Sequence, residues 1–152
     1  MNPAPSQTPY QPAGLLPRLG AVFYDSLLLL AVWFCATAIL LPFTHGEALQ
    51  AGNPLFTSYL FMVSFFFYGW FWVHGGQTLG LRAWRLRVQR PDGRPITWLQ
   101  ALLRFLTAMV SWAALGMGFW WILFDKRKRG WHDLYSETEM VRVSKDYLRS
   151  VR

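Results

Sequence analysis

Three charged side chains stand in apolar surroundings, and they are the residues best placed to carry chemistry. Asp25 is the one charged residue between Leu19 and Leu41, and Arg18 directly precedes this run. A carboxylate inside an apolar span costs on the order of 3 kcal/mol, so it is expected to face a bundle interior or a wet cavity with a partner. We predict Arg104, from a later apolar region, as that partner. Protonation of Asp25 would then release Arg104, and such a linked change can couple proton movement to another solute.

Arg104 belongs to a polar stripe in which residues recur at spacings of three and four. This spacing puts the stripe on one helical face. Two of its members, Gln100 and Thr107, are expected to be hydrogen-bond neighbours of the Asp25–Arg104 pair. A helix lying in the membrane interface fits the same stripe, so this alternative stays open. The stripe consists of Thr97, Gln100, Arg104, Thr107 and Ser111.

Arg18 needs a different partner from Asp25. The two lie seven residues apart, so they share a helical face but sit about 10 Å apart along the axis. We expect Arg18 to reach from the membrane edge to Asp133 or Asp125. The chain would then hold two ion pairs at different depths.

Motifs of common enzyme classes are missing from the sequence. It has no Gly-x-Ser-x-Gly, no phosphate loop ending in Gly-Lys-Ser or Gly-Lys-Thr, and no His-Glu-x-x-His. Its histidines, His45, His74 and His132, lie in separate segments without metal-ligand spacing. The net charge of +7 comes without an aromatic-and-basic nucleic-acid motif. We therefore expect no enzyme activity, no metal or other cofactor, and no nucleic-acid partner.

Two long apolar runs must position these charges. The first, Leu15–Leu41, has a core long enough to cross a hydrocarbon layer of roughly 30 Å. The second, Leu55–His74, has 20 residues without a formal charge. With 53% hydrophobic and 15% charged residues, the composition departs from that of soluble proteins. The sequence predicts an all-α membrane protein with two full transmembrane helices.

A third apolar region, Ile96–Phe124, precedes a tail with eight basic residues. One straight span would put that tail outside, against the positive-inside tendency. Gly116 and Gly118 offer a place to bend. We therefore predict a re-entrant pair or helical hairpin, roughly Thr97–Ser111 and Leu115–Phe124, that completes a small bundle and leaves both termini cytoplasmic.

An arginine-rich linker joins the second and third apolar regions. Trp84, Leu86 and Val88 alternate with polar residues, which predicts a short cytoplasmic β-strand or hairpin element at the membrane surface. Met140–Val143 alternates weakly and is compatible with another short strand. Three arginines of the linker could bind anionic lipid head groups, or they could simply fix the orientation and stay solvated. They are Arg82, Arg85 and Arg87.

The two ends of the chain differ from its middle. Residues 1–14 are rich in proline and carry no charged side chain, which predicts a disordered tail. Residues 15–143 form the transmembrane domain, and residues 144–152 form a basic tail.

Several spaced motifs resemble the RDD family of small integral membrane proteins, named for its Arg, Asp and Asp. The three signature residues match Arg18, Asp25 and Asp133 here. The resemblance continues through Gly76-Gln77-Thr78-Leu79-Gly80, the arginine-rich strand, Gln100 to Phe105, and Leu123-Phe124-Asp125. One departure lies near the end, where Glu137 and Glu139 flank Thr138 and members often have a small residue before the threonine.

The resemblance implies two classes of function. Some members are proposed transporters, including cation-proton antiporters, whereas eukaryotic relatives look like assembly partners of larger membrane complexes. We therefore expect transport of an ion or small solute, with a non-catalytic scaffold or accessory subunit as the alternative. Three or four short helices cannot enclose a pathway alone, so we expect a homo-oligomer or a larger complex. The resemblance and the cytoplasmic arginines favour a bacterial inner membrane with anionic lipid contacts.

Overall fold

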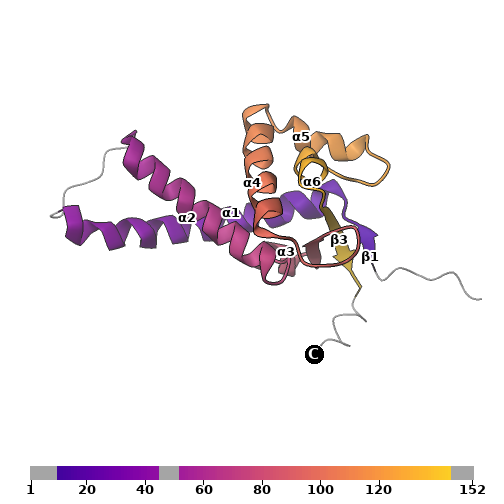
Figure 1. The fold of residues 1–152 in the computed structure, drawn as a ribbon, viewed down its shortest axis with the longest axis horizontal. Coiled ribbons are helices and arrows are strands. Elements are labelled where there is room, and N and C mark those ends of the chain that lie inside the picture. The colour runs from indigo at the N-terminus through magenta and orange to yellow at the C-terminus, as the bar shows by residue number, and fades with distance from the viewer. Residues whose placement is uncertain (1–9, 45–51, 145–152) are drawn as a thin grey trace, which may run out of the picture.

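The computed structural model describes residues 10–44 and 52–144. Two long helices, α1 (Leu15–Leu40) and α2 (Pro54–Val73), lie against each other and extend away from the rest of the molecule (Figure 1). A short 3-10 helix, η1 (Leu41–Thr44), continues α1. Asn53 caps α2 by accepting hydrogen bonds from its first amides, and Pro54 occupies the first helical position, where no amide donor is needed.

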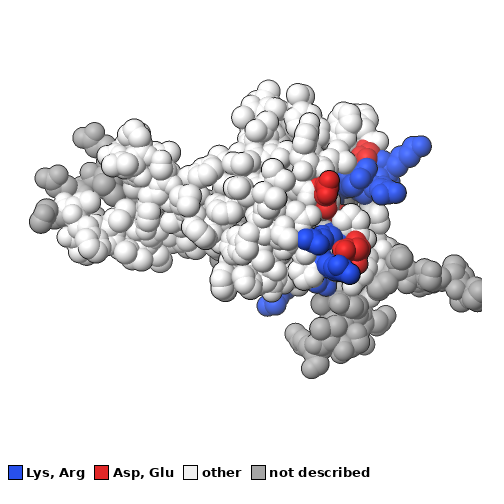
Figure 2. Space-filling model, in the orientation of Figure 1, with Lys and Arg blue, Asp and Glu red and all other residues white. Residues whose placement is uncertain are grey.

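Both helices match the predicted apolar runs closely. They are long and apolar enough to cross a membrane. Large side chains on their outer faces stay exposed, among them Phe34 and Leu55. Figure 2 shows that the helical pair carries no charged side chain on the visible face, and that the charges gather at the other end of the molecule.

The third apolar region is broken, as predicted. Its first part, α4 (Trp98–Ala113), starts at a capping box between Thr97 and Gln100. Its second part contains α5 (Met117–Trp120) and the 3-10 helix η2 (Trp121–Leu123), and the axis bends by 107° between the two parts. Gly116 makes this bend with a φ of +76°, a conformation that favours glycine.

A three-stranded antiparallel sheet lies at the charged end, in the order β1-β3-β2. β1 (Tyr10–Pro12) precedes α1, β2 (Leu86–Gln89) follows the short helix α3 (Leu79–Ala83), and β3 (Glu139–Val143) follows the short helix α6 (Trp131–Tyr135). The sheet therefore joins the segments before α1, after α2 and after η2. The third apolar region must begin and end on the same side of the molecule.

Two predictions about this sheet need correction. The β element is not a local hairpin, because its strands come from three distant segments. The predicted disordered tail is wrong at its end, since Tyr10–Pro12 pairs with β3 even though this piece carries a proline. β1 is an edge strand, where a missing amide donor is tolerated. Residues 1–9 and the predicted basic tail from residue 145 lie outside the described residues.

The alternation in the arginine-rich linker is confirmed for Leu86 and Val88 but not for Trp84, which precedes β2 and is 43% exposed. Leu86 and Val88 are fully buried on one face of β2, and they join a core that includes Leu81, Ile96 and Phe105. This core joins the sheet to α1, α2 and α4.

Candidate functional site

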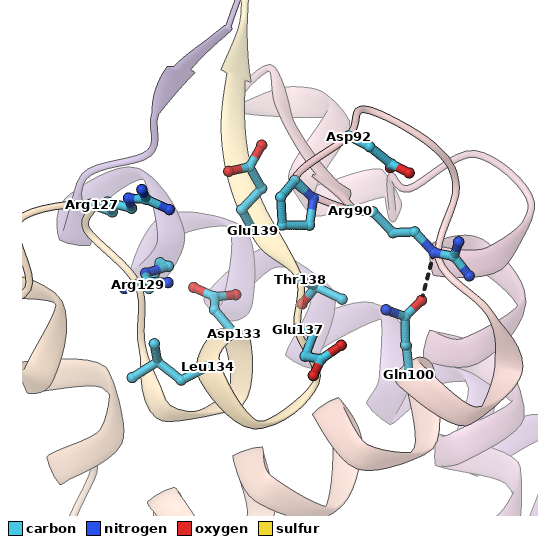
Figure 3. A pocket seen from close by; sticks show the side chains of 11 residues that line it. Arg90, Asp92, Gln100, Arg127, Arg129, Asp133, Leu134, Glu137, Thr138 and Glu139 are labelled. Atoms are coloured by element: carbon cyan, nitrogen blue, oxygen red, sulfur yellow. Dashed lines mark hydrogen bonds between the residues drawn. The ribbon is translucent and has the colours of Figure 1, made fainter.

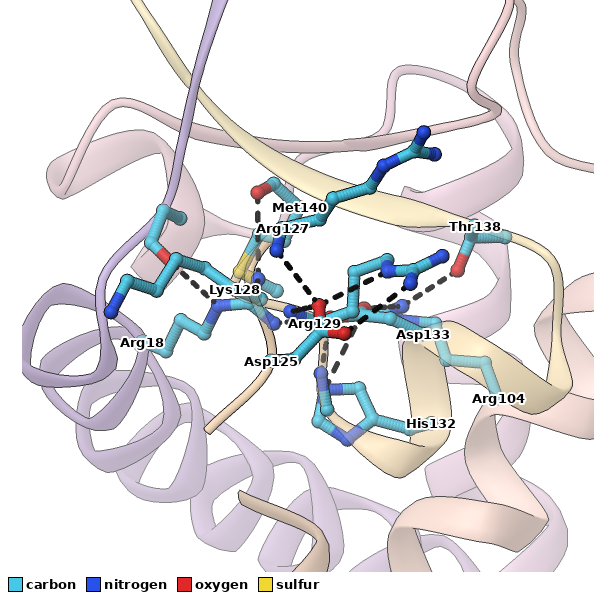
Figure 4. Close-up of polar contacts among 12 residues, drawn as sticks. Arg18, Arg104, Asp125, Arg127, Lys128, Arg129, His132, Asp133, Thr138 and Met140 are labelled. Carbon is cyan, nitrogen blue, oxygen red and sulfur yellow. Dashed lines mark hydrogen bonds and ion pairs between the residues drawn. The ribbon is translucent and has the colours of Figure 1, made fainter. Parts of the chain in front are cut away.

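Asp133 lies at the centre of a buried charge cluster and is shared by two arginines (Figure 4). Arg18 donates from Nη1 to Asp133 Oδ2 at 2.5 Å, and Arg104 donates from Nη1 to Asp133 Oδ1 at 2.5 Å. The three residues are only 1–2% exposed. They come from α1, α4 and α6, so one carboxylate joins three elements that are distant in sequence. We call Arg18, Arg104, His132 and Asp133 the charge cluster.

Arg18 also binds backbone carbonyls around the cluster. Its Nε donates to the carbonyl oxygen of Ala13 at 3.2 Å, and its Nη2 donates to that of Lys128 at 2.6 Å. These bonds tie the strand-side end of α1 to the basic loop before α6. Arg18 therefore uses its guanidinium fork for structure as well as for charge pairing.

Arg104 is less completely satisfied. Its Nη1 also donates to Thr138 Oγ1 at 2.8 Å, and its guanidinium lies 5.4 Å from the centre of the Trp72 ring, within the range of a cation–π contact. Its Nε has no hydrogen-bond partner among the described residues. An unmade hydrogen bond of a buried charged group is costly, so this atom marks a place where a further acceptor would be favourable.

Glycines allow the elements around Asp133 to approach one another. A Cβ on Gly118 would lie 2.4 Å from Ser111 Oγ, and a Cβ on Gly130 would lie 2.9 Å from the carbonyl oxygen of Gly118. The amide of Gly130 donates to Asp133 Oδ2 at 3.0 Å. Small residues thus let α5 and α6 close over α4, and Asp133 binds the start of its own helix.

The cluster fixes the protonation of both α6 side chains. Burial alone would raise the pKa of Asp133, but the charges of Arg18 and Arg104 outweigh it and hold that pKa well below its usual range. Burial lowers the pKa of His132 to about 3, and the two arginines act in the same direction against the opposing charge of Asp133. At neutral pH the cluster therefore contains two cations, one anion and a neutral imidazole.

Asp25 occupies a second, separate buried site. Its Oδ2 accepts a hydrogen bond from Thr78 Oγ1 at 2.5 Å, and its Oδ1 accepts one from the amide of Gly80 at 2.8 Å. Asp25 is 3% exposed. A Cβ on Gly80 would lie 2.4 Å from the carbonyl oxygen of Ala21, so only glycine lets α3 pack this closely against α1.

One of the two predicted ion pairs is present and the other is not. Arg18 pairs with Asp133, one of its two predicted partners. The predicted Asp25–Arg104 pair is wrong, because Arg104 binds Asp133 while Asp25 binds neutral donors at the start of α3. The proton switch that depended on that pair loses its geometric basis.

The remaining predicted neighbours lie elsewhere. Gln100 accepts hydrogen bonds from Arg90 Nε and from the amide of Thr97, so it belongs to the helix cap. Thr107 donates to the carbonyl oxygen of Leu103 in its own helix. Asp125 is bound to Arg129 on the surface loop, and this hydrogen bond lowers the pKa of its carboxyl group. None of the three contacts Asp25 or Asp133 through a described hydrogen bond.

The predicted lipid-contact arginines lie together near the start of the sheet. Arg82 is exposed in α3, Arg85 is half-buried between α3 and β2, and Arg87 is half-buried in β2. Arg85 has a φ of +55°, which is uncommon for a residue with a side chain. No described contact brings any of the three to the charge cluster.

Reasoning from charge missed the neutral residues of both sites. Thr78 and Gly80 hold Asp25, and Thr138 binds Arg104. Ser136 supports this arrangement, because its hydroxyl lies 2.7 Å from that of Thr138. The available signal was the Gly76–Gly80 motif, whose threonine and glycine supply a hydroxyl and an unobstructed amide.

A polar cleft of about 660 Å³ lies on the outer side of Asp133 (Figure 3). Side chains of both signs line it, including Arg90, Arg127, Glu137 and Glu139. This mixture gives the cleft no single charge preference. The described residues hold no group of three or more His, Cys, Asp or Glu side chains that could bind a metal ion.

The fold and the site define a small helical protein with two parts. The apolar hairpin consists of α1 and α2, and the cap consists of the sheet with α3 and α6, which buried charges join to α1. The RDD family model matches residues 12–137, most of the chain, so this protein belongs to the RDD family. Comparisons with curated proteins and with solved structures gave no match. Family membership and the apolar helices together indicate an integral membrane protein.

Proposed function

We propose that this protein is a non-catalytic membrane scaffold or accessory subunit. The observation that carries this proposal is that all three signature residues are buried and bound within the chain. Arg18 and Asp133 join α1 to α6, and Asp25 joins α1 to α3. Charges used in this way specify how the cap docks on the helical hairpin.

We also propose its orientation in the bilayer. α1 and α2 cross the membrane, and the bent α4–η2 segment enters it and returns to the same side. The pairing of β1 with β3 supports this path, because it brings segments near both ends of the described chain together. The basic residues of the linker and tail favour the cytoplasm for this side. A bacterial inner membrane is the bilayer that fits this arrangement.

The partners that we propose follow from two surfaces. Arg82, Arg85 and Arg87 lie near the sheet, where they can bind anionic lipid head groups at the cytoplasmic interface. Exposed apolar side chains on the hairpin, such as Phe34 and Phe66, suit contact with lipid, a second copy, or other subunits of a larger complex.

Proton-coupled transport is less well supported than scaffolding. Proton coupling through Asp25 would require an ion pair that breaks when Asp25 is protonated, and Arg104 was the predicted partner. The described contacts instead pair Arg104 with Asp133. Asp25 has neutral partners that can stay bound without any movement of a cation. The geometry therefore favours the alternative that the family resemblance left open.

Cation flux in proteoliposomes tests this choice. The protein and its Asp25→Asn variant are reconstituted, with folding checked by size-exclusion chromatography, and flux is followed under an imposed pH gradient. We expect no pH-dependent flux from either. Flux in the native protein that disappears in a folded Asp25→Asn variant would overturn the proposal.

A scaffold or accessory subunit should be found in a complex with a partner, which a mass measurement can test. Native membranes are extracted in a mild detergent, and the mass of the particle that contains the protein is determined. We expect a particle larger than the single chain, containing a partner in fixed ratio. A lone monomer at every detergent concentration would contradict a scaffold role.

A further inference from the structure

A mainly apolar cavity of about 280 Å³ lies between α1, α2 and α4. One part of its wall is formed by the charge cluster, through Arg18, Arg104 and His132. The rest is largely apolar and includes Leu29 and Met109. The cavity wall is therefore cationic at the charge cluster and apolar elsewhere.

A second cavity of about 480 Å³ lies beside the first, between α1, α2 and α4. The two cavities share four lining residues, Leu29, Tyr68, Phe105 and Met109. The second is further lined by Trp33 and by residues of α2. Along α1, Trp33 lies about 22 Å beyond Arg18. The two cavities therefore lie next to each other, and the first is the one that reaches the charge cluster.

The charge cluster lacks a second anion. Two guanidinium groups share the single carboxylate of Asp133, and His132 is neutral at physiological pH. Arg104 Nε and His132 Nδ1 are buried and have no hydrogen-bond partner among the described residues. Both can donate to an acceptor, His132 in the tautomer that carries its proton on Nδ1. A bound carboxylate would balance the charge and satisfy these donors.

We propose that the two cavities bind a single-chain anionic amphiphile, a long-chain fatty acid. Its carboxylate lies at Arg104 and His132, and its chain runs past Leu29 and Met109 into the second cavity. The first cavity, at about 280 Å³, is just below the roughly 300–1,000 Å³ typical of ligand sites, so it accommodates one chain rather than a two-chain phospholipid. The ligand's orientation, with its head at the basic side, matches that of lipids in the adjacent leaflet.

Photocrosslinking of the full-length protein tests this site. The protein is placed in nanodiscs of zwitterionic phosphatidylcholine with a hexadecanoate analogue that carries a diazirine midway along its chain. Labelled peptides are identified by mass spectrometry. We expect labels at Leu29, Phe105 or Met109. Labels spread evenly over outward-facing residues such as Phe34 would overturn the proposal.

Competition identifies the chemistry of the head group without any variant. Unlabelled hexadecanoate should reduce labelling, whereas hexadecanol should compete about tenfold less well because it lacks the charge that Arg104 would bind. Equal competition by the alcohol would overturn the role of the charge cluster. Equal competition by phosphatidylglycerol would show a two-chain lipid in the site and overturn the single-chain assignment.

Two matched variants locate the site. Ala108 lines the first cavity, whereas Ala113 is exposed on the same helix. Ala108→Phe should lower labelling about tenfold by filling the space, and Ala113→Phe should leave it unchanged. Equal labelling of both folded variants would overturn the proposal. If Ala108→Phe fails to fold, the competition between hexadecanoate and hexadecanol decides whether the proposal stands.

Discussion

The two buried aspartates of this protein are held in opposite ways. Asp133 lies between two guanidinium groups, whereas Asp25 accepts hydrogen bonds from a hydroxyl and a backbone amide. Charge compensates burial at Asp133, and neutral dipoles compensate it at Asp25. Loss of the carboxylate charge should therefore disrupt the first site much more than the second.

The difference also separates two structural tasks. Asp133 joins three distant elements, so it controls whether the cap forms on the hairpin. Asp25 joins α1 to the neighbouring α3 through a close approach at Gly80. Within the same family signature, Asp133 joins three distant elements, whereas Asp25 joins α1 to α3 alone.

The largest effect is expected from Asp133→Asn. This change leaves two buried arginines without their anion, so the free energy of unfolding should fall by roughly 3–5 kcal/mol. Chemical unfolding in mixed micelles measures it. The control is Asp125→Asn, which removes a partly exposed loop ion pair with Arg129 and should cost at most about 1 kcal/mol. Similar losses in the two variants would contradict a central role for Asp133.

A somewhat smaller effect is expected from Gly80→Ala. The added methyl group would meet the carbonyl oxygen of Ala21 and the carboxylate of Asp25, so unfolding should require about 3 kcal/mol less free energy. Gly75→Ala is the matched control, because its Cβ would meet nothing within 4 Å. Equal stability of the two variants would show that α3 does not pack tightly on α1.

Removal of one hydroxyl sharpens the description of the Asp25 site. Thr78→Val loses the hydrogen bond to Asp25 and the cap on the amide of Leu81, which should lower the free energy of unfolding by roughly 2 kcal/mol. Thr78→Ser retains the hydroxyl and should retain most of the stability. Equal losses from valine and serine would point to packing of the methyl group instead.

Over a single pH unit, the smallest effect is a pH dependence confined to the charge cluster. His132 has a folded pKa of about 3 against an ordinary 6.5, so the unfolded chain binds a proton between these values that the folded chain does not. Stability should fall as the pH drops below 6.5, by up to about 1.4 kcal/mol per pH unit. Below about pH 4 the lowered pKa of Asp133 adds to the loss.

Unfolding at several pH values measures this dependence. His132→Gln should flatten the profile between about pH 6.5 and 4, whereas substitution of the exposed His74 by Gln should not. An unchanged slope in His132→Gln would show that another group titrates.

The hairpin and the break after α4 were predictable from the sequence, because long apolar runs and a glycine pair directly reflect helix length and bending. For Arg18, a buried arginine that needs an anion, the sequence left two candidates, Asp133 and Asp125, and the structure selects Asp133. The Asp25 site was not. Its donors lie more than fifty residues away and carry no charge, so the sequence pointed instead to Arg104, the cation in the polar stripe of the third apolar region.

The sheet was only partly predictable. Alternation revealed β2, whereas β1 is too short and too rich in proline to be seen before its partner β3 is placed. The sharing of one aspartate by two arginines was hidden for a similar reason. It depends on the folding of α6 over α4, which glycines at positions 118 and 130 permit.

Double-mutant cycles with Arg104 test the central claim most directly. Arg104→Met is combined with Asp133→Asn in one cycle and with Asp25→Asn in the other, and unfolding is measured in the same micelles. The account predicts a coupling energy of roughly 1–3 kcal/mol with Asp133 and one near zero with Asp25. Strong coupling of Arg104 to Asp25, with little to Asp133, would contradict it.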